Sequence, residues 1–380
     1  MRILIVEPQC QGFEHARFNS ALLATIAQAF PSAQLTFWAE AQHLSEVTQL
    51  LPPLPLSAQP IDISWPAPLR QRCEAETRFC EHALDLAAAT SIGIVVFSSV
   101  SSLTLLALKH LLPSHPYRGS VVAVPHGVLA GLLHRPKRVW NWPFDIHTAL
   151  RRPTPQNLIL VALTQTIYSH ITARFDATPW WQIDHPYIFD HPVTEPPIVN
   201  RRTENVKIGL MGALRNNLTP IIALIDRIHS ELPGIEFIQI GHLRQTGRPA
   251  DLLSKRISNP AVSPISSSEY IRRLVSVDYA LCIHEPDHHR FVASATFLDL
   301  MNVPKPALSI STPLSREYDR RFGDRGYTCA SLEELASHTI QVLKQKADPQ
   351  YTAFLRNLSF ARRHFCPDVV AETLRQVLTH

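Results

Sequence analysis

Short apolar runs alternate with longer helical segments along the whole chain, and this alternation constrains the fold more than any other feature. Residues 2–7 and 92–98 are two such runs, and each is followed by a segment with helical spacing. Runs of this kind are typical of parallel strands that helices bury on both faces. Repeated strand–helix units of this type build a doubly wound sheet. We therefore expect an α/β fold.

The alternation falls into two series, separated by a polar, proline-rich stretch. In the first series we expect strands at 2–7, 34–38, 92–98, 120–124 and 158–163, and helices at 15–30, 67–89, 103–112 and 166–174. In the second we expect strands at 206–211, 236–241, 278–283 and 306–309, and helices at 218–232, 267–275, 293–301, 332–346 and 349–378. A chain of 380 residues suits two domains. We predict two Rossmann-like domains, at 1–190 and 206–350, joined by a linker at 191–205.

Composition excludes several classes of protein. The net charge of +4 is small for this length and argues against nucleic-acid binding as the main role. The six cysteines are scattered without a Cys-x-x-Cys pair, which favours reduced thiols. The opening MRILIVEP is typical of a strand rather than of a signal peptide, and no apolar run is long enough to span a membrane. We expect a cytoplasmic protein.

Candidate site residues of the first half lie after predicted strands, because ligands of open parallel sheets bind beyond the carboxyl ends of the strands. Gly12 would let the backbone approach a substrate closely, and Glu14 and His15 are titratable groups at the start of the next helix. His126 follows a strand and stands between proline and glycine, where it would bind a hydroxyl group or act as a base. The alternatives are that Glu14 only interacts favourably with the helix dipole, that His15 is solvated, and that His126 is an ordinary turn residue.

Candidate residues of the second half occur in two loops. Gly212 and Arg215 follow the first strand of this half, and a guanidinium group binds phosphate oxygens in pairs. Ser294, Ala295 and Thr296 open a helix whose free amide groups would bind an anion, and Asp299 follows one turn later. A surface arginine and an ordinary Ser/Thr helix cap are the alternatives.

A dense group of His, Asp and Glu side chains precedes that helix. It comprises His284, Glu285, Asp287, His288 and His289. The spacing does not match a defined coordination geometry, so we expect no metal.

Taken together, these loops resemble those of GT-B glycosyltransferases, in particular the large retaining group that includes bacterial lipopolysaccharide and mannosyl transferases. The residues that carry the resemblance are Gln11-Gly12-Phe13, His126, Gly212 with Arg215, the segments 267–270 and 277–281, and SATFLDLMNVPKPAL at 294–308. The resemblance implies an acceptor-side first domain, a second domain that binds the sugar nucleotide, and a central cleft between them. It also implies that a last helix, 351–380, crosses back to the first domain.

The chain departs from the family pattern at four places. Where the family often has two glutamates separated by seven residues, Phe291 and Asp299 stand. Val303 or Pro304 replaces a usual glycine, and Ala213 stands where an arginine is frequent. These departures concern the retaining mechanism more than the fold.

The resemblance implies a hexosyltransferase-type glycosyltransferase that moves a sugar from a sugar nucleotide to a glycan, lipid-linked or other acceptor, as in polysaccharide biosynthesis, without a cofactor. Arg215 and the amide groups at 294–296 would stabilise the diphosphate, and His126 would position the donor sugar. In an inverting reaction Glu14 or His15 would be the base; for a retaining reaction no nucleophile is evident. The alternatives are a sugar-nucleotide epimerase of the same fold and a catalytically inactive binding protein.

Residues 134–152 combine basic and aromatic side chains. They include Arg135, Lys137, Arg138, Trp140, Trp142, Phe144, Arg151 and Arg152. This combination suits an anionic membrane surface and equally an anionic saccharide. The alternative is a structural loop with solvated charges. We expect the segment to recruit the acceptor, with peripheral contact to the inner membrane.

Overall fold

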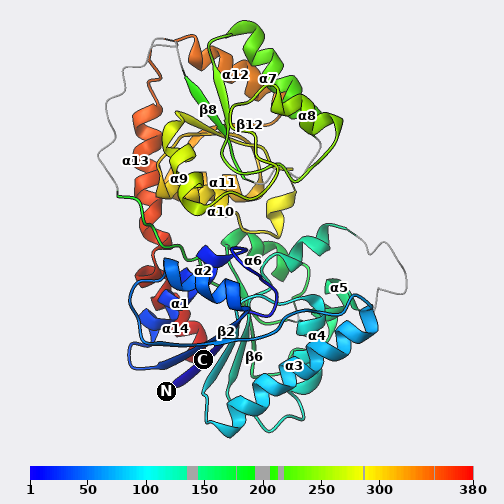
Figure 1. The fold of residues 1–380 in the computed structure, drawn as a ribbon. Coiled ribbons are helices and arrows are strands. Elements are labelled where there is room, and N and C mark those ends of the chain that lie inside the picture. Colours follow the sequence, from blue (N-terminus) through cyan, green and yellow to red (C-terminus); the bar gives the residue numbers. More distant parts are fainter. Residues whose placement is uncertain are drawn as a thin grey trace. The chain divides into compact units, whose positions relative to one another are not determined.

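The chain forms two compact units, each with its own sheet (Figure 1). The computed structural model describes residues 1–134, 144–176, 178–192, 206–212, 218–285, 287–345 and 347–379. Unit 1 consists of Met1–Ile188, Arg290–Ala293 and His364–His380, and unit 2 of Phe189–His289 and Ser294–Arg363. The predicted domain bounds stay a prediction, since most of the predicted linker, 193–205, lies outside the described residues.

Unit 1 is built on a parallel sheet of seven strands in the order β3-β2-β1-β4-β5-β6-β7. The strands are β1 (Arg2–Val6), β2 (Gln34–Ala39), β3 (Leu56–Pro60), β4 (Ile94–Phe97), β5 (Ser120–Ala123), β6 (Leu158–Ala162) and β7 (Trp180–Gln182). The helices are α1 (Ala16–Ala29), α2 (Ala41–Leu50), α3 (Leu69–Ala89), α4 (Ser102–Leu111), the 3-10 helix η1 (Val128–Leu133), α5 (Ile146–Arg151), α6 (Gln165–Thr172) and α14 (Pro367–Thr379).

Helices cover both faces of this sheet, which explains the uninterrupted apolar runs. Ile3 and Ile5 of β1 point to the face covered by α1 and α14, which pack against each other. Leu4 and Val6 point to the opposite face, which α3 and α4 cover (Figure 1). Because both faces are buried, residues 3–6 of β1 are apolar on both faces, and only Arg2 at the start of the strand is exposed.

Unit 2 is built on a parallel sheet of five strands in the order β12-β11-β10-β8-β9. The strands are β8 (Lys207–Leu210), β9 (Glu236–Gln239), β10 (Tyr279–Cys282), β11 (Ala307–Ile310) and β12 (Gly326–Cys329). The helices are α7 (Thr219–Glu231), α8 (Arg248–Ser254), α9 (Ser267–Ser276), α10 (Ala295–Asn302), α11 (Pro313–Phe322), α12 (Leu332–Leu343) and α13 (Tyr351–Arg362), with 3-10 turns η3 (His288–Arg290) and η4 (Arg363–Phe365) at the unit borders.

Each sheet contains one point at which the strand order reverses. In unit 1 it lies between β1 and β4, and in unit 2 between β8 and β10. The loops that leave neighbouring strands at such a point turn to opposite faces of the sheet, and ligands of open α/β sheets bind there, beyond the carboxyl ends of the strands. The loops after β1, β4, β8 and β10 are therefore the first places to look for a site.

The prediction of two doubly wound parallel sheets is confirmed, but several elements were missed. Residues 39–66 were predicted as a loop, yet they contain α2 and β3; the short elements β7, η1, α5, α8, α11 and β12 were not predicted. β3 is an edge strand with four of its five residues exposed, so it carries no apolar pattern. In α2, the Glu40 carboxylate accepts hydrogen bonds from the backbone N–H groups of Gln42 and His43 and begins the helix.

The single helix predicted at 349–378 is wrong. The segment forms α13, the turn η4 and α14, and α14 begins at Pro367. Proline has no N–H group and its ring clashes with the carbonyl four residues earlier, so a helix ends before it and a new one begins with it. Among the described residues, no helix is long and apolar enough to cross a membrane.

Candidate functional site

The loop between β1 and α1 adopts an unusual backbone conformation. Gly12 has a φ of 53° and His15 a φ of 55°. A non-glycine residue rarely adopts this left-handed conformation, and such strain gathers at functional sites. Phe13, Glu14 and His15 are exposed there. Three predicted site residues, Gly12, Glu14 and His15, thus lie together at the carboxyl edge of the sheet.

His126 meets His15 although the two residues belong to loops after different strands. Their ring centroids are 4.2 Å apart in an edge-on arrangement, and the His126 ring is 4.6 Å from Phe18 of α1. The loops after β1 and β5 therefore bring these two predicted residues together.

A third histidine, His185, completes this cluster. It follows β7, and its ring centroid lies 5.5 Å from His126 and 4.9 Å from Phe18. Its Nδ1 lies 2.9 Å from the backbone carbonyl of Pro186. No pattern in the sequence points to His185, because β7 has only three residues and leaves no strand signal.

Burial keeps two of these histidines neutral at pH 7. It lowers the pKa of His126 well below its ordinary value, and nearby His15 and His185 lower it further. Burial also lowers the pKa of His185, to about 4. The Nδ1 atom of His126 is buried and has no hydrogen-bond partner among the described residues. A neutral imidazole in this position is suited to orient a hydroxyl group or to take a proton from one.

In unit 2, three loops converge on Gly212, which follows β8 and has a φ of 75°. A methyl group on Gly212 would lie 3.5 Å from Oγ1 of Thr296, in the first turn of α10. A methyl group on Gly241, after β9, would lie 2.2 Å from the Gly212 carbonyl oxygen. The structure thus brings together the predicted residues Gly212 and Thr296, whereas Arg215 and Ala213 lie outside the described residues.

The start of α10 has no side-chain cap. Ser294 occupies the N-cap position and is buried, but its side chain accepts no hydrogen bond from the helix. The alternative interpretation of Ser294 as an ordinary cap is therefore wrong. Amide groups at an uncapped helix start are suited to an anion, since they carry the positive end of the helix dipole.

Asp299 lies one turn further along α10 and is buried. Its Oδ2 accepts a hydrogen bond of 2.9 Å from the hydroxyl group of Tyr270 in α9. The hydroxyl donor stabilises the buried carboxylate. The predicted contact of Asp299 with a ribose stays a prediction.

The histidines before α10 pack as aromatic rings. The centroids of His284 and His289 are 4.3 Å apart, and both rings lie near Phe297. Within the described parts of the chain, no group of three or more His, Cys, Asp or Glu side chains is arranged to hold a metal ion. Phe291, where the family pattern has a glutamate, is buried in the core of unit 1.

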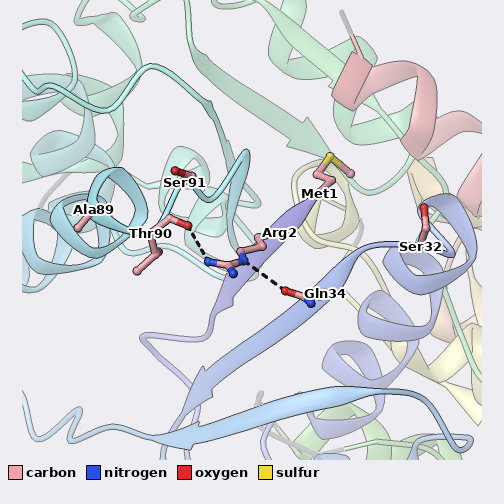
Figure 2. A pocket seen from close by; sticks show the side chains of 7 residues that line it. All are labelled: Met1, Arg2, Ser32, Gln34, Ala89, Thr90 and Ser91. Atoms are coloured by element: carbon pink, nitrogen blue, oxygen red, sulfur yellow. Dashed lines mark hydrogen bonds between the residues drawn. The ribbon is translucent and has the colours of Figure 1, made fainter.

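An open pocket of about 600 Å³ lies at the opposite, amino-terminal edge of the unit 1 sheet (Figure 2). Met1, Arg2, Gln34 and Thr90 are among its lining residues. The Arg2 guanidinium already donates to Gln34 Oε1 at 3.2 Å and to the Thr90 carbonyl at 3.0 Å. Ligands of such sheets bind at the carboxyl edge, so this pocket is not part of the candidate site.

Comparison with known proteins establishes the fold. No family model and no curated protein matches the sequence. Solved structures do match over the full chain. HepE from Anabaena in complex with UDP-glucose is 14% identical, with a TM-score of 0.68 and coverage of 100% of this chain and 99% of HepE. WaaG, a glycosyltransferase involved in lipopolysaccharide biosynthesis, is 12% identical, with a TM-score of 0.65 and complete coverage of both chains.

A putative UDP-N-acetylglucosamine 2-epimerase from Listeria monocytogenes is also similar. It is 12% identical, with a TM-score of 0.59 and coverage of 98% of this chain and 94% of the epimerase. At these identities the similarity concerns the fold. The chain has the GT-B fold of two Rossmann-like domains.

Proposed function

We propose that the chain is a hexosyltransferase-type glycosyltransferase that moves a sugar from a sugar nucleotide to a glycan or lipid-linked acceptor. The main support for this proposal is the close approach of Thr296 to Gly212, at the point where the strand order of unit 2 reverses. HepE and WaaG share the fold, and the HepE structure holds UDP-glucose.

Unit 2 would bind the diphosphate of the donor. Gly212 has no side chain, so a phosphate group would reach the backbone between this loop and the uncapped start of α10. Arg215, three residues after Gly212, would add a charged clamp. Together these groups would stabilise the leaving diphosphate without a metal or cofactor.

Unit 1 would hold the acceptor. The neutral His126 would position the donor sugar or a hydroxyl group, and Glu14 or His15 would be the base of an inverting reaction. Because His126 is neutral, it accepts a proton or a hydrogen bond through an unprotonated nitrogen, which a charged imidazolium would not do.

The basic and aromatic segment at 134–152 would recruit the acceptor or an anionic membrane surface. Residues 135–143 lie outside the described residues. Phe144 packs against the core of unit 1, and its carbonyl accepts a hydrogen bond of 2.7 Å from Ser102. Phe144 therefore has a structural role, whereas Arg151 and Arg152 are exposed and able to meet an anionic partner. Charge reversal of Arg135, Lys137 and Arg138 should abolish binding to anionic liposomes or raise the acceptor KM.

The role of His126 is tested by His126→Asn against the control His110→Asn, which changes an exposed residue of α4. Sugar transfer should fall by about 10²-fold or more in His126→Asn, because misplacing a reacting group by about 1 Å costs a factor of this order. Nucleotide affinity, measured by calorimetry, should not change, because the nucleotide would bind to unit 2. Equal transfer rates in the two variants would exclude His126 from the reaction.

A further inference from the structure

Glu7 is a buried carboxylate at the point where the strand order of unit 1 reverses. It follows β1 directly and is fully buried. Its two oxygens accept hydrogen bonds from the backbone N–H groups of Gln9 (2.8 Å) and Cys10 (3.0 Å), and from the side chains of Asn19 (3.0 Å), Ser98 (2.9 Å) and Ser99. Glu7 thus connects the loop after β1 with the loop after β4.

The hydrogen bonds keep this carboxylate ionised. Burial raises the pKa of Glu7, but the hydrogen bonds from Ser99, Asn19 and Gln9 outweigh burial, and the pKa lies below its ordinary value. An ionised carboxylate only accepts hydrogen bonds. Every group that faces Glu7 must therefore be a donor.

This requirement fixes the direction of a chain of hydrogen bonds that ends at Gly12. The Asn19 amide nitrogen lies 3.0 Å from Glu7 Oε2 and 2.8 Å from Nε2 of His43. It donates one hydrogen to each, so Nε2 of His43 accepts and the proton of the ring is on Nδ1. That Nδ1 lies 2.6 Å from the carbonyl oxygen of Gly12 and donates to it.

Gly12 is held through both of its backbone polar groups. Its carbonyl oxygen accepts from His43, and its N–H donates to Oε2 of Glu40 at 3.2 Å. These two bonds fix the left-handed turn that presents Phe13, Glu14 and His15 to solvent. Phe13 is 53% exposed although it is aromatic.

We propose that Glu7 is a positioning residue for acceptor binding, which it controls through Asn19, the tautomer of His43 and the turn at Gly12. The proposal rests on the proposed function. Phe13, Glu14 and His15 would touch the acceptor, whereas Glu7 would act only by holding their backbone in place.

Replacing Glu7 by glutamine would break the chain, because only the orientation with the amide nitrogen towards Asn19 avoids a clash with fixed N–H groups. If the amide nitrogen of the new glutamine faced Asn19, the Asn19 side chain would have to rotate. Its oxygen would then face both this nitrogen and Nε2 of His43. Nε2 of His43 would then take the proton, and Nδ1 would face the Gly12 carbonyl as a second acceptor. If the amide nitrogen faced the other way, it would meet the backbone N–H groups of Gln9 and Cys10, which cannot turn.

The test compares Glu7→Gln with Glu76→Gln in the full chain. Glu76 is also a buried carboxylate of unit 1, and it accepts hydrogen bonds from Arg72 at 2.7 Å, Thr104 at 2.5 Å and Ser101, none of which belongs to the turn 10–15. Nitrogen NMR of the His43 ring reports its tautomer. Steady-state kinetics give the acceptor KM, and calorimetry gives nucleotide affinity.

We expect wild-type His43 to carry its proton on Nδ1. In Glu7→Gln the Nδ1–H signal should be lost. The acceptor KM should rise by about tenfold, which is the effect expected from the loss of one hydrogen bond. Nucleotide affinity should not change. Glu76→Gln should retain both the tautomer and the acceptor KM. A wild-type proton on Nε2, or an unchanged tautomer and KM in Glu7→Gln, would overturn the proposal.

If Glu7→Gln does not fold, His43→Phe serves in its place. It retains Glu7 with its direct contacts and removes only the donor to Gly12. An acceptor KM equal to that of the wild type would then overturn the proposal, and a tenfold rise would support it. If the wild type transfers no sugar to any acceptor, the proposed function fails, whereas the tautomer of His43 in Glu7→Gln still decides whether Glu7 fixes the turn.

Discussion

Replacing Gly241 by alanine tests how closely the loops around Gly212 are packed. The added Cβ would lie 2.2 Å from the carbonyl oxygen and 2.7 Å from the carbonyl carbon of Gly212. Real Cβ atoms essentially never approach another heavy atom within 3.0 Å, so one backbone must move by roughly 1 Å. Overpacking lowers the free energy of unfolding by about 1–3 kcal/mol, and we expect about 3 kcal/mol here because the clash is with the backbone. The shift of Gly212 should also weaken nucleotide binding.

Gly234→Ala is the matched control. Gly234 precedes β9 on the same unit, and an added Cβ would meet no atom within 4 Å. We expect this substitution to change the free energy of unfolding by less than about 1 kcal/mol. Urea unfolding measures stability, and calorimetric titration with UDP and GDP measures binding. If both variants unfold at the same urea concentration and bind nucleotide equally well, the close packing around Gly212 is refuted.

The remaining predictions concern pH, nucleotide binding and one buried carboxylate. Because the folded pKa of His185 is about 4, the unfolded state binds a proton that the folded state does not as the pH falls from 6.5 towards 4. His185 should therefore contribute a fall of about 3 kcal/mol in the free energy of unfolding over this range, and His185→Asn should make the profile less steep; a slope equal to that of the wild type would contradict the assignment. Arg215→Ala should weaken nucleotide binding by about 1.5–3 kcal/mol, and unchanged calorimetric affinity would remove Arg215 from the site. Tyr270→Phe should lower the free energy of unfolding in urea by about 1–3 kcal/mol, since Asp299 Oδ2 loses the hydrogen bond from this hydroxyl group; wild-type stability would show that the hydrogen bond contributes nothing.

The strands that could be predicted are those that helices bury on both faces. β1 and β4 are such strands, and every residue in them except Arg2 is buried. β3 at the sheet edge is largely exposed, and β7 has only three residues, so neither leaves a pattern in the sequence. The break before α14 was predictable from Pro367, because proline within a helix removes a hydrogen bond and clashes with the preceding turn.

The sequence predicts the candidate site only in part, because the ends of predicted strands show which loops belong to it but not how these loops pack together. Gly12, His15 and His126 are each identified as candidates by their position after a predicted strand. That His15 and His126 touch, and that His185 joins them, depends on packing between distant parts of the chain. Glu7 offered a usable signal, since a carboxylate at the end of an apolar run is buried only when donors surround it.

The products of turnover decide whether the protein transfers a sugar from a sugar nucleotide. The protein is incubated with a panel of UDP- and GDP-sugars and glycan or lipid-linked acceptors, and both nucleotides and sugars are quantified. We expect free nucleoside diphosphate in an amount equal to that of the glycosylated acceptor. An isomerised sugar nucleotide without release of nucleoside diphosphate would instead indicate an epimerase, and nucleotide binding without any turnover across the panel would contradict an enzyme altogether.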